Sequence, residues 1–171
     1  MKELDVQLVV VRHGKAGERS DWAKISSDDE LRPLTEKGVK EFGEVARHLH
    51  KIFPQLDLIL SSSLVRAKQT AEILAKEYEK SFDVIDTLYP SSLRADVDKT
   101  LKRVIELSSL SKIAIAIVGH EPTLGEWVGE WIGSTVPLIF KKGGLMVLHF
   151  QSFPSAGTGR LSFASDPKYL K

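Results

Sequence analysis

The sequence predicts an α/β protein with three αβα layers: a mainly parallel sheet, helices on both faces and an antiparallel hairpin at the C-terminal edge. Three observations predict this class. Short apolar runs alternate with segments of helical periodicity, the order expected of parallel strands joined by right-handed crossovers. The runs at 7–11 and 113–119 are apolar at almost every position, as in strands buried on both faces. Two further strand-like runs near the C-terminus are separated by Pro154 and several glycines.

Local patterns place the individual elements. Strands are expected at 7–11, 56–60, 82–88, 113–119, 145–150 and 160–164. Helices are expected over the apolar stripes at 39–49, 67–78, 97–108 and 124–132. Thr35 suits the cap of the first helix, and Pro122 suits the start of the last because its missing N–H is tolerated there. The last two strands are expected to pair as the edge hairpin.

Length, charge and composition limit the classes of function. A chain of 171 residues fits one domain, residues 1–171. The formal net charge of +1, from 24 basic and 23 acidic residues, gives no reason to expect a nucleic acid or a membrane as partner. The absence of cysteine excludes disulfides and thiol chemistry. Residues 1–5 do not resemble a signal peptide and no apolar run has the length of a membrane span, so we expect a cytoplasmic protein.

One connection is unusually long. Residues 15–34 link the first strand to its helix, whereas such connections usually take only a few residues, and long loops in compact domains are functional or disordered. We interpret the acidic run at 28–30 as a solvated patch. Trp22 is either a partly buried anchor or a substrate contact. Arg32 stands just before the next helix, and we expect it to carry its guanidinium to the mouth of the sheet.

Two histidines directly follow buried strands. His13 comes after the first strand, within Arg12-His13-Gly14, and His120 comes after the run at 113–119. Because ligands bind in the crevice outside the carboxyl ends of parallel strands, the two side chains are expected to face one another there. A lone Arg-His-Gly motif would be weak evidence, so the interpretation depends on the residues that accompany the pair.

Arginines from three segments are expected to join the histidines. Arg12 precedes His13, Arg32 ends the long loop, and Arg66 lies on the first turn of the helix after the second strand. Guanidinium groups match phosphate oxygens in pairs, although the same cations would also hold a carboxylate or a sulfate. A histidine among them favours phosphate, because imidazole attacks phosphorus well and its phosphoramidate is readily hydrolysed. The pattern therefore predicts phosphoryl transfer.

At these residues the chain resembles the histidine phosphatase superfamily, also called phosphoglycerate mutase-like, and within it the small SixA-type protein phosphohistidine phosphatases. Four ordered motifs carry the resemblance over essentially the whole chain, at residues 10–16, 32–38, 62–71 and 118–122. The resemblance implies that His13 is the phosphorylated nucleophile and that Arg12, Arg66 and His120 bind the phosphoryl group. It also implies that Arg32 is the further arginine typical of the SixA-type branch, and that neither a metal nor an organic cofactor takes part.

Other residues near these motifs have more open roles. Gly14 and Ser62 are candidate substrate-binding residues, and Lys15 lies close enough in sequence to contact the phosphate. Glu121 follows His120 at the place where acid phosphatases of the other branch carry a proton donor. We interpret Glu121 either as such a donor or as a favourable charge on the first turn of the helix that follows.

A departure from the larger relatives bears on the substrate. Those relatives carry a glutamate acid after the third strand and insertions that roof the site, whereas residues 88–93 contain neither. An alkoxide leaving group needs a proton, but a protonated imidazole does not. The favoured hypothesis is therefore a phosphatase for phosphohistidine on a protein. A small-molecule phosphatase acting on a phosphomonoester or polyphosphorylated metabolite is the alternative, and a module that binds phosphorylated partners without turnover is a third.

Overall fold

The computed structural model describes residues 3–169, so the first two of the residues 1–5 that do not resemble a signal peptide, Met1 and Lys2, lie outside the described residues. The strands are β1 (Asp5–Arg12), β2 (Leu58–Ser61), β3 (Asp83–Val84), β4 (Lys112–Gly119), β5 (Leu145–Phe150) and β6 (Arg160–Ser165). The α-helices are α1 (Arg19–Trp22), α2 (Glu36–Ile52), α3 (Val65–Glu77), α4 (Arg94–Ser108) and α5 (Thr123–Trp131). Short 3₁₀ helices cover Asp29–Leu31, Asp86–Leu88 and Pro167–Tyr169.

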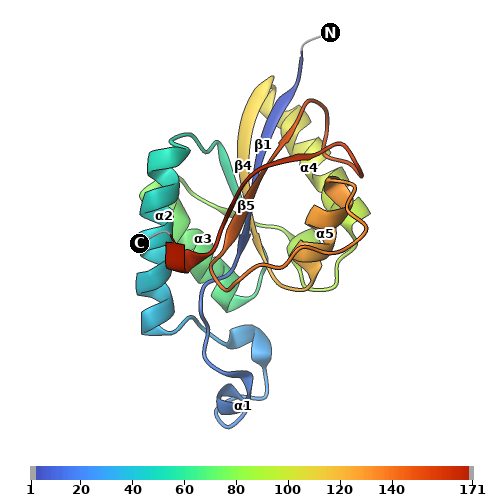
Figure 1. Ribbon diagram of the computed structural model, residues 1–171. Coiled ribbons are helices and arrows are strands. Elements are labelled where there is room, and N and C mark those ends of the chain that lie inside the picture. Colours follow the sequence, from blue (N-terminus) through green and yellow to red (C-terminus); the bar gives the residue numbers. More distant parts are fainter. Residues whose placement is uncertain (1–2, 170–171) are drawn as a thin grey trace.

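The strands form one mixed sheet in the order β3-β2-β4-β1-β5-β6 (Figure 1). β1, β4, β2 and β3 are parallel, whereas β5 runs antiparallel to β1 and β6 runs antiparallel to β5. The predicted fold class is confirmed, including the antiparallel hairpin at the C-terminal edge. Within residues 3–169, no helix has both the length and the apolar character needed to cross a membrane.

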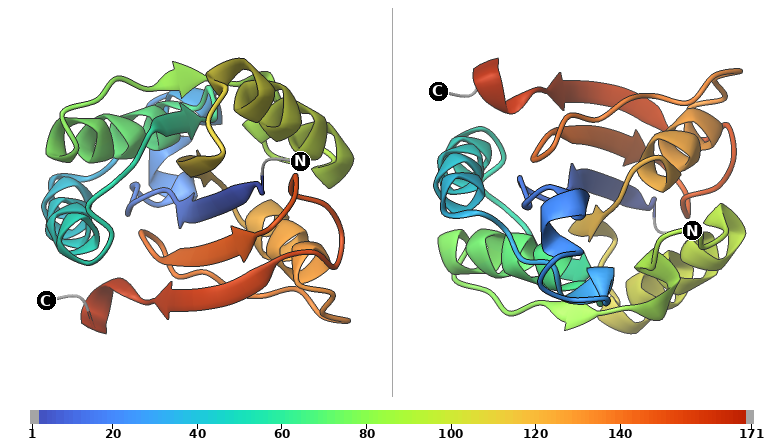
Figure 2. Two further views of the ribbon diagram at one scale, coloured as in Figure 1. Left: turned by 90° about the horizontal axis from the view of Figure 1, so that it is seen from above. Right: turned by 90° about the horizontal axis from the view of Figure 1, so that it is seen from below.

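Helices cover both faces of the sheet, with α2 and α3 on one side and α4 and α5 on the other (Figure 2). Side chains alternate between the two faces along each strand. In β1, Leu8 packs toward α4 and α5, and Val9 packs toward α2 and α3; in β4, Ile115 and Ala116 do the same. This double burial explains why these two strands lack the polar alternation of a half-exposed sheet.

The third strand is shorter than predicted. Only Asp83 and Val84 pair with β2, and residues 86–88 turn into a 3₁₀ helix instead of continuing the strand. Both paired residues are exposed at the edge of the sheet, whereas Leu88 is buried in the core beside α4 and α5. Burial of Leu88 in that core favours the turn over further strand pairing.

The helix starts follow the predicted signals, with one difference in the buried face of α2. The Thr35 hydroxyl accepts a hydrogen bond from the Gly38 amide at 2.9 Å, and Pro122 occupies the cap position of α5. Val39, expected in the buried stripe, is exposed. Gly38 is buried in its place, because a Cβ there would lie 2.0 Å from the Lys15 carbonyl oxygen.

We expect Gly125→Ala to destabilise the fold, because a Cβ at this α5 position would lie 1.8 Å from the Leu138 carbonyl oxygen. The segment after α5 would have to shift, at a cost of about 2 kcal/mol or more. Gly43→Ala in α2 is the matched control, since its Cβ would meet nothing within 4 Å and the helix would gain up to about 1 kcal/mol. Urea unfolding of both variants measures the difference, and equal effects would contradict this prediction.

Candidate active site

The ends of three neighbouring strands define the site. Arg12 at the end of β1 lies directly opposite Gly119 at the end of β4. The ladder continues one residue further, because the His13 amide donates to the Gly119 carbonyl at 3.1 Å and the Ser62 amide donates to the Val118 carbonyl at 3.0 Å. His13, Ser62 and His120 therefore leave the sheet side by side at its carboxyl edge, as predicted from their positions after the strands.

The two histidines face one another. Their ring centroids are 5.1 Å apart, and both side chains are buried. His13 Nδ1 lies 2.7 Å from the Gly14 carbonyl oxygen. Because a carbonyl can only accept, Nδ1 carries the proton and Nε2 keeps its lone pair. His120 Nε2 lies 2.9 Å from the Ser62 hydroxyl, which fixes the orientation of the second ring.

Both imidazoles are neutral near pH 7. Burial lowers the pKa of His13 to about 3, and the charges of His120, Arg66 and Arg12 act in the same direction, although the hydrogen bond to Gly14 opposes them. Burial also lowers the pKa of His120 to about 3, reinforced by the charges of Arg66 and Arg12. A neutral imidazole is the nucleophilic form, so His13 is in the protonation state that nucleophilic attack would require.

Arg12 and Arg66 bring cationic N–H groups to this edge with part of their hydrogen-bonding capacity unused. Arg12 Nη1 donates to the Phe140 carbonyl at 2.6 Å, and Arg66 Nη1 donates to the Asp29 carbonyl at 2.8 Å. Within residues 3–169, the buried side-chain nitrogens and oxygens that lack a partner are Arg12 Nε, Arg66 Nε and His120 Nδ1. Buried charged donors ordinarily have acceptors, and an anion among these groups would supply them.

Arg32 also lies at this edge, but it is buried and not at an open mouth. Its Nη1 donates to the Gly17 carbonyl at 2.6 Å, and its Nε donates to Asp29 Oδ1 at 2.8 Å. Asp29 in turn lies 3.3 Å from Arg66 Nη2. The structure therefore links Arg32 to Arg66 through a carboxylate.

The interpretation of residues 28–30 as a solvated patch is wrong for Asp29, which pairs with two buried arginines. Sequence periodicity could not reveal this pairing, because the partners are brought together only by the tertiary fold. Glu30 accepts a hydrogen bond from the Tyr89 hydroxyl. Trp22 anchors the loop, since its indole Nε1 donates to the Asp28 carbonyl at 2.8 Å.

Thr70, predicted only as part of a buried helix stripe, connects two of the residues at this edge. Its hydroxyl accepts the Gly14 amide at 2.9 Å and donates to the Arg66 carbonyl at 2.7 Å. Gly14 thus uses its carbonyl to orient His13 and its amide to bind Thr70. Lys15 is exposed beside these residues. In the sequence, this role of Thr70 was indicated only by a hydroxyl residue within an otherwise apolar helix stripe.

Glu121 holds a loop against the site. Its Oε1 accepts the Phe140 amide at 2.6 Å, and its Oε2 accepts the Gly125 amide at 3.4 Å. Burial raises the pKa of Glu121, although these two hydrogen bonds oppose the shift. The carbonyl of Phe140 is the acceptor for Arg12. Glu121 therefore binds the amide of Phe140, and Arg12 binds the carbonyl of the same residue.

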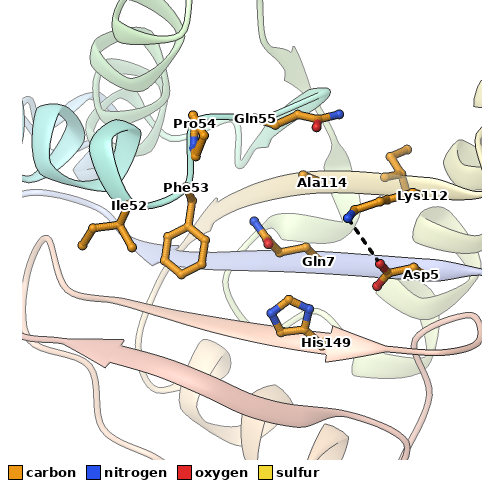
Figure 3. Close-up of a pocket in the computed structure, with 10 residues that line it drawn as sticks. Asp5, Gln7, Ile52, Phe53, Pro54, Gln55, Lys112, Ala114 and His149 are labelled. Carbon is orange, nitrogen blue, oxygen red and sulfur yellow. Dashed lines mark ion pairs between the residues drawn. The ribbon is translucent and has the colours of Figure 1, made fainter.

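A cavity of about 290 Å³ lies at the other edge of the sheet, where β1 and β4 begin (Figure 3). Gln7, Phe53 and His149 line it, with an exposed ion pair of 3.9 Å between Asp5 and Lys112. No arginine is among its lining residues, so its chemistry differs from that of the edge where the histidines and arginines meet. In the part of the chain that the structure describes, no three histidine, aspartate or glutamate side chains gather in a metal-binding arrangement.

Comparisons with known proteins agree with this geometry. The family model of the histidine phosphatase superfamily (branch 1) matches residues 8–90. An uncharacterized protein of Picosynechococcus sp. is 37% identical over 123 residues, which cover 71% of this chain and 70% of that protein. The chain belongs to the histidine phosphatase superfamily. It is therefore a hydrolase of the phosphatase class.

The SixA proteins are relatives in both sequence and fold. Phosphohistidine phosphatase SixA of Escherichia coli (strain K12) is 24% identical over 168 residues, which cover 97% of each chain. The structure of the protein histidine phosphatase SixA complexed with tungstate superposes with a TM-score of 0.81 at 23% identity, over 96% of this chain and 99% of that chain. This similarity confirms the predicted resemblance to the SixA-type branch.

The neutral histidines predict a pH-dependent stability. A histidine whose pKa is lowered on folding takes up its proton more readily in the unfolded chain, so stability falls as pH drops below about 6.5 toward the folded pKa. His13→Gln removes one such group. As pH falls from 7.5 to 5, we expect the wild type to lose about 2 kcal/mol more unfolding free energy than this variant loses. Urea unfolding at both pH values tests this, and a pH-independent difference would show that His13 titrates normally.

Proposed function

We propose that this protein hydrolyses phosphohistidine on a protein partner through a covalent phosphoryl intermediate on His13. The observation that carries the proposal is the set of unpartnered buried nitrogens, Arg12 Nε, Arg66 Nε and His120 Nδ1, at the same sheet edge as the free Nε2 of His13. These groups suit the oxygens of a phosphoryl group in reach of a nucleophile. Action in cytoplasmic signal transduction, as a single domain, belongs to the same proposal.

In the first step, His13 Nε2 forms a bond to phosphorus as the bond from phosphorus to the substrate imidazole breaks. The hydrogen bond from Nδ1 to Gly14 keeps the attacking nitrogen aimed at the pocket and supports the positive charge that develops on the ring. Arg12 and Arg66 neutralise charge on the transferring oxygens, which is the main contribution a protein makes to this chemistry. The departing imidazole leaves with the proton that it carried as the protonated phosphohistidine.

In the second step, water attacks the phosphoryl group on His13 and releases orthophosphate. The oxygen of water ends on phosphorus, the bond from phosphorus to Nε2 breaks, and His13 returns to its neutral form. His120 and Ser62, 2.9 Å apart, lie beside the reacting group and can orient this water. Over the whole cycle, one water is consumed for each phosphoramidate bond that is broken.

A protein substrate is favoured by the surroundings of the edge. Residues 88–93, which lead into α4, contain no acidic residue, and both Leu93 and Ile139 are largely exposed to solvent. Exposed apolar residues on the loops around a polar pocket suit contact with a macromolecular surface. An unprotonated leaving group would need an acid that this edge does not offer in the usual position.

A trapped intermediate tests the mechanism. Wild-type enzyme quenched during turnover of a ³²P-labelled phosphohistidine protein should carry acid-labile, alkali-stable label on His13. His13→Ala should lose the label and at least about 10⁴-fold in kcat, because removing a nucleophile from an enzyme removes most of its acceleration. Mass spectrometry locates the label. Near-full activity of His13→Ala would exclude the covalent route.

Glu121→Gln separates a proton donor from a positioning residue. A glutamine amide nitrogen cannot accept, so either Phe140 or Gly125 loses its acceptor and Arg12 is held less firmly. We expect kcat/KM to fall about tenfold for phosphohistidine and for an alkyl phosphate alike. Glu126→Gln, an exposed change of equal charge on the α5 helix that follows Glu121, should have little effect. The small-molecule phosphatase would be favoured by two results together: wild type turns over the alkyl phosphate faster than phosphohistidine, and Glu121→Gln loses activity only on the alkyl phosphate.

A further inference from the structure

We propose that Asp29 sets the anionic charge that the site accepts, admitting a single phosphoryl group and disfavouring polyphosphorylated ligands. The inference rests on the proposed phosphoryl site and names the substrate class that this site selects. Asp29 acts through Arg32 and Arg66, so it is a positioning and specificity-determining residue and makes no bond to phosphorus itself.

The contacts of Asp29 place a carboxylate among the phosphate-binding arginines. Oδ1 accepts from Arg32 Nε at 2.8 Å, and Oδ2 lies 3.3 Å from Arg66 Nη2. The backbone carbonyl of the same residue accepts from Arg66 Nη1 at 2.8 Å. Arg19 Nε lies 3.6 Å from Oδ1 on the outer side of the loop. One residue therefore binds Arg66 twice and joins it to Arg32.

This carboxylate is held in place by its loop. The Trp22 indole and the Asp28 carbonyl are joined by a hydrogen bond, and Asp28 Oδ1 caps the 3₁₀ turn by accepting the Glu30 amide at 2.9 Å. Glu30 accepts a hydrogen bond from the hydroxyl of Tyr89, which follows the 3₁₀ helix after β3. The Asp29 side chain is about one-third exposed, at 34%, so one flank meets the arginines and the other meets solvent. Its charge therefore acts at the entrance of the pocket.

The charges explain the expected selectivity. Arg12, Arg32 and Arg66 contribute three positive charges, Asp29 contributes one negative charge, and the two histidines are neutral. These four side chains sum to plus two, opposite to the charge of one phosphoryl dianion, and the further charges of Arg19 and Glu30 near Arg66 have opposite signs and offset one another. A second phosphate on the same ligand would lie toward the entrance, beside the carboxylates of Asp29 and Glu30, which both act on Arg66. At separations of several ångströms in a partly solvated site, such like-charge repulsion raises the dissociation constant of the ligand roughly tenfold.

The chain offers a matched pair of variants. Asp29→Asn removes the charge and keeps an oxygen that can accept from Arg32. Asp28→Asn removes the same charge one residue away, where the side chain caps the 3₁₀ turn and asparagine caps equally well, and no contact with an arginine is made. Asp29→Glu restores the charge and serves as the conservative rescue.

The experiment measures inhibition of phosphohistidine hydrolysis by orthophosphate, pyrophosphate and tripolyphosphate in wild type and the three variants. We expect Asp29→Asn to lower the inhibition constants of pyrophosphate and tripolyphosphate about tenfold relative to that of orthophosphate. Asp28→Asn should change this ratio less than threefold, because its charge is solvated and screened. Asp29→Glu should keep the discrimination of wild type. Thermal unfolding of each variant accompanies the measurement.

Several outcomes would overturn the proposal. An unchanged ratio in Asp29→Asn, or equal weakening of all three anions with a lower Tm, would mean that Asp29 only supports the loop. An equal change of the ratio in Asp28→Asn would assign the effect to general surface charge. Failure of the proposed function is a separate result, because it requires that wild type neither binds orthophosphate nor hydrolyses phosphohistidine, whatever the behaviour of the Asp29 variants.

Discussion

The parallel pairing of β1 with β4 is the constraint on which the rest of the site depends. The register sets Arg12 opposite Gly119, so the next residue of each strand is a histidine at the same height. Both strands are buried on both faces, and a slip of one residue would turn every apolar side chain toward the wrong layer. The hydrophobic core thus fixes the 5.1 Å separation of the two imidazoles without any direct bond between them.

The arginines at the edge of the core need hydrogen-bond acceptors, because burial removes the water that would otherwise bind their charged N–H groups. Loops provide these acceptors as main-chain carbonyls, from Phe140 to Arg12, from Gly17 to Arg32 and from Asp29 to Arg66. Carbonyls satisfy N–H groups without cancelling the positive charge. The pocket therefore keeps its attraction for an anion while its arginines are held in place before the ligand arrives, which reduces the reorganisation needed at the moment of reaction.

The sequence predicted where the proposed nucleophile and its neighbours lie in the fold, because these residues stand at fixed offsets from strands that periodicity identifies. His13 and His120 need only the end of a buried run to be placed, and Arg66 needs only the start of a helix. The contacts of Asp29 and Thr70, and the hydrogen bonds that Arg12 and Glu121 make with Phe140, could not be predicted in this way. Their partners lie 37, 56 and 128 residues away along the chain, and neither propensity nor spacing records such contacts. β3 was overestimated for a related reason, since its length depends on the packing of Leu88.

This division assigns different properties to different parts of the molecule. Strand ends fix the position of His13, its tautomer and its neutral state, so the chemical step that we propose is tied to the stability of the core. The long loop after β1 and the loop after α5 hold the arginines through Asp29 and through Phe140, and both remain at the surface. Substitution of Asp29 is expected to change which anions fit without disturbing His13, because Asp29 contacts Arg32 and Arg66. Selectivity in this fold can therefore vary in the loops while the reaction itself stays with the sheet.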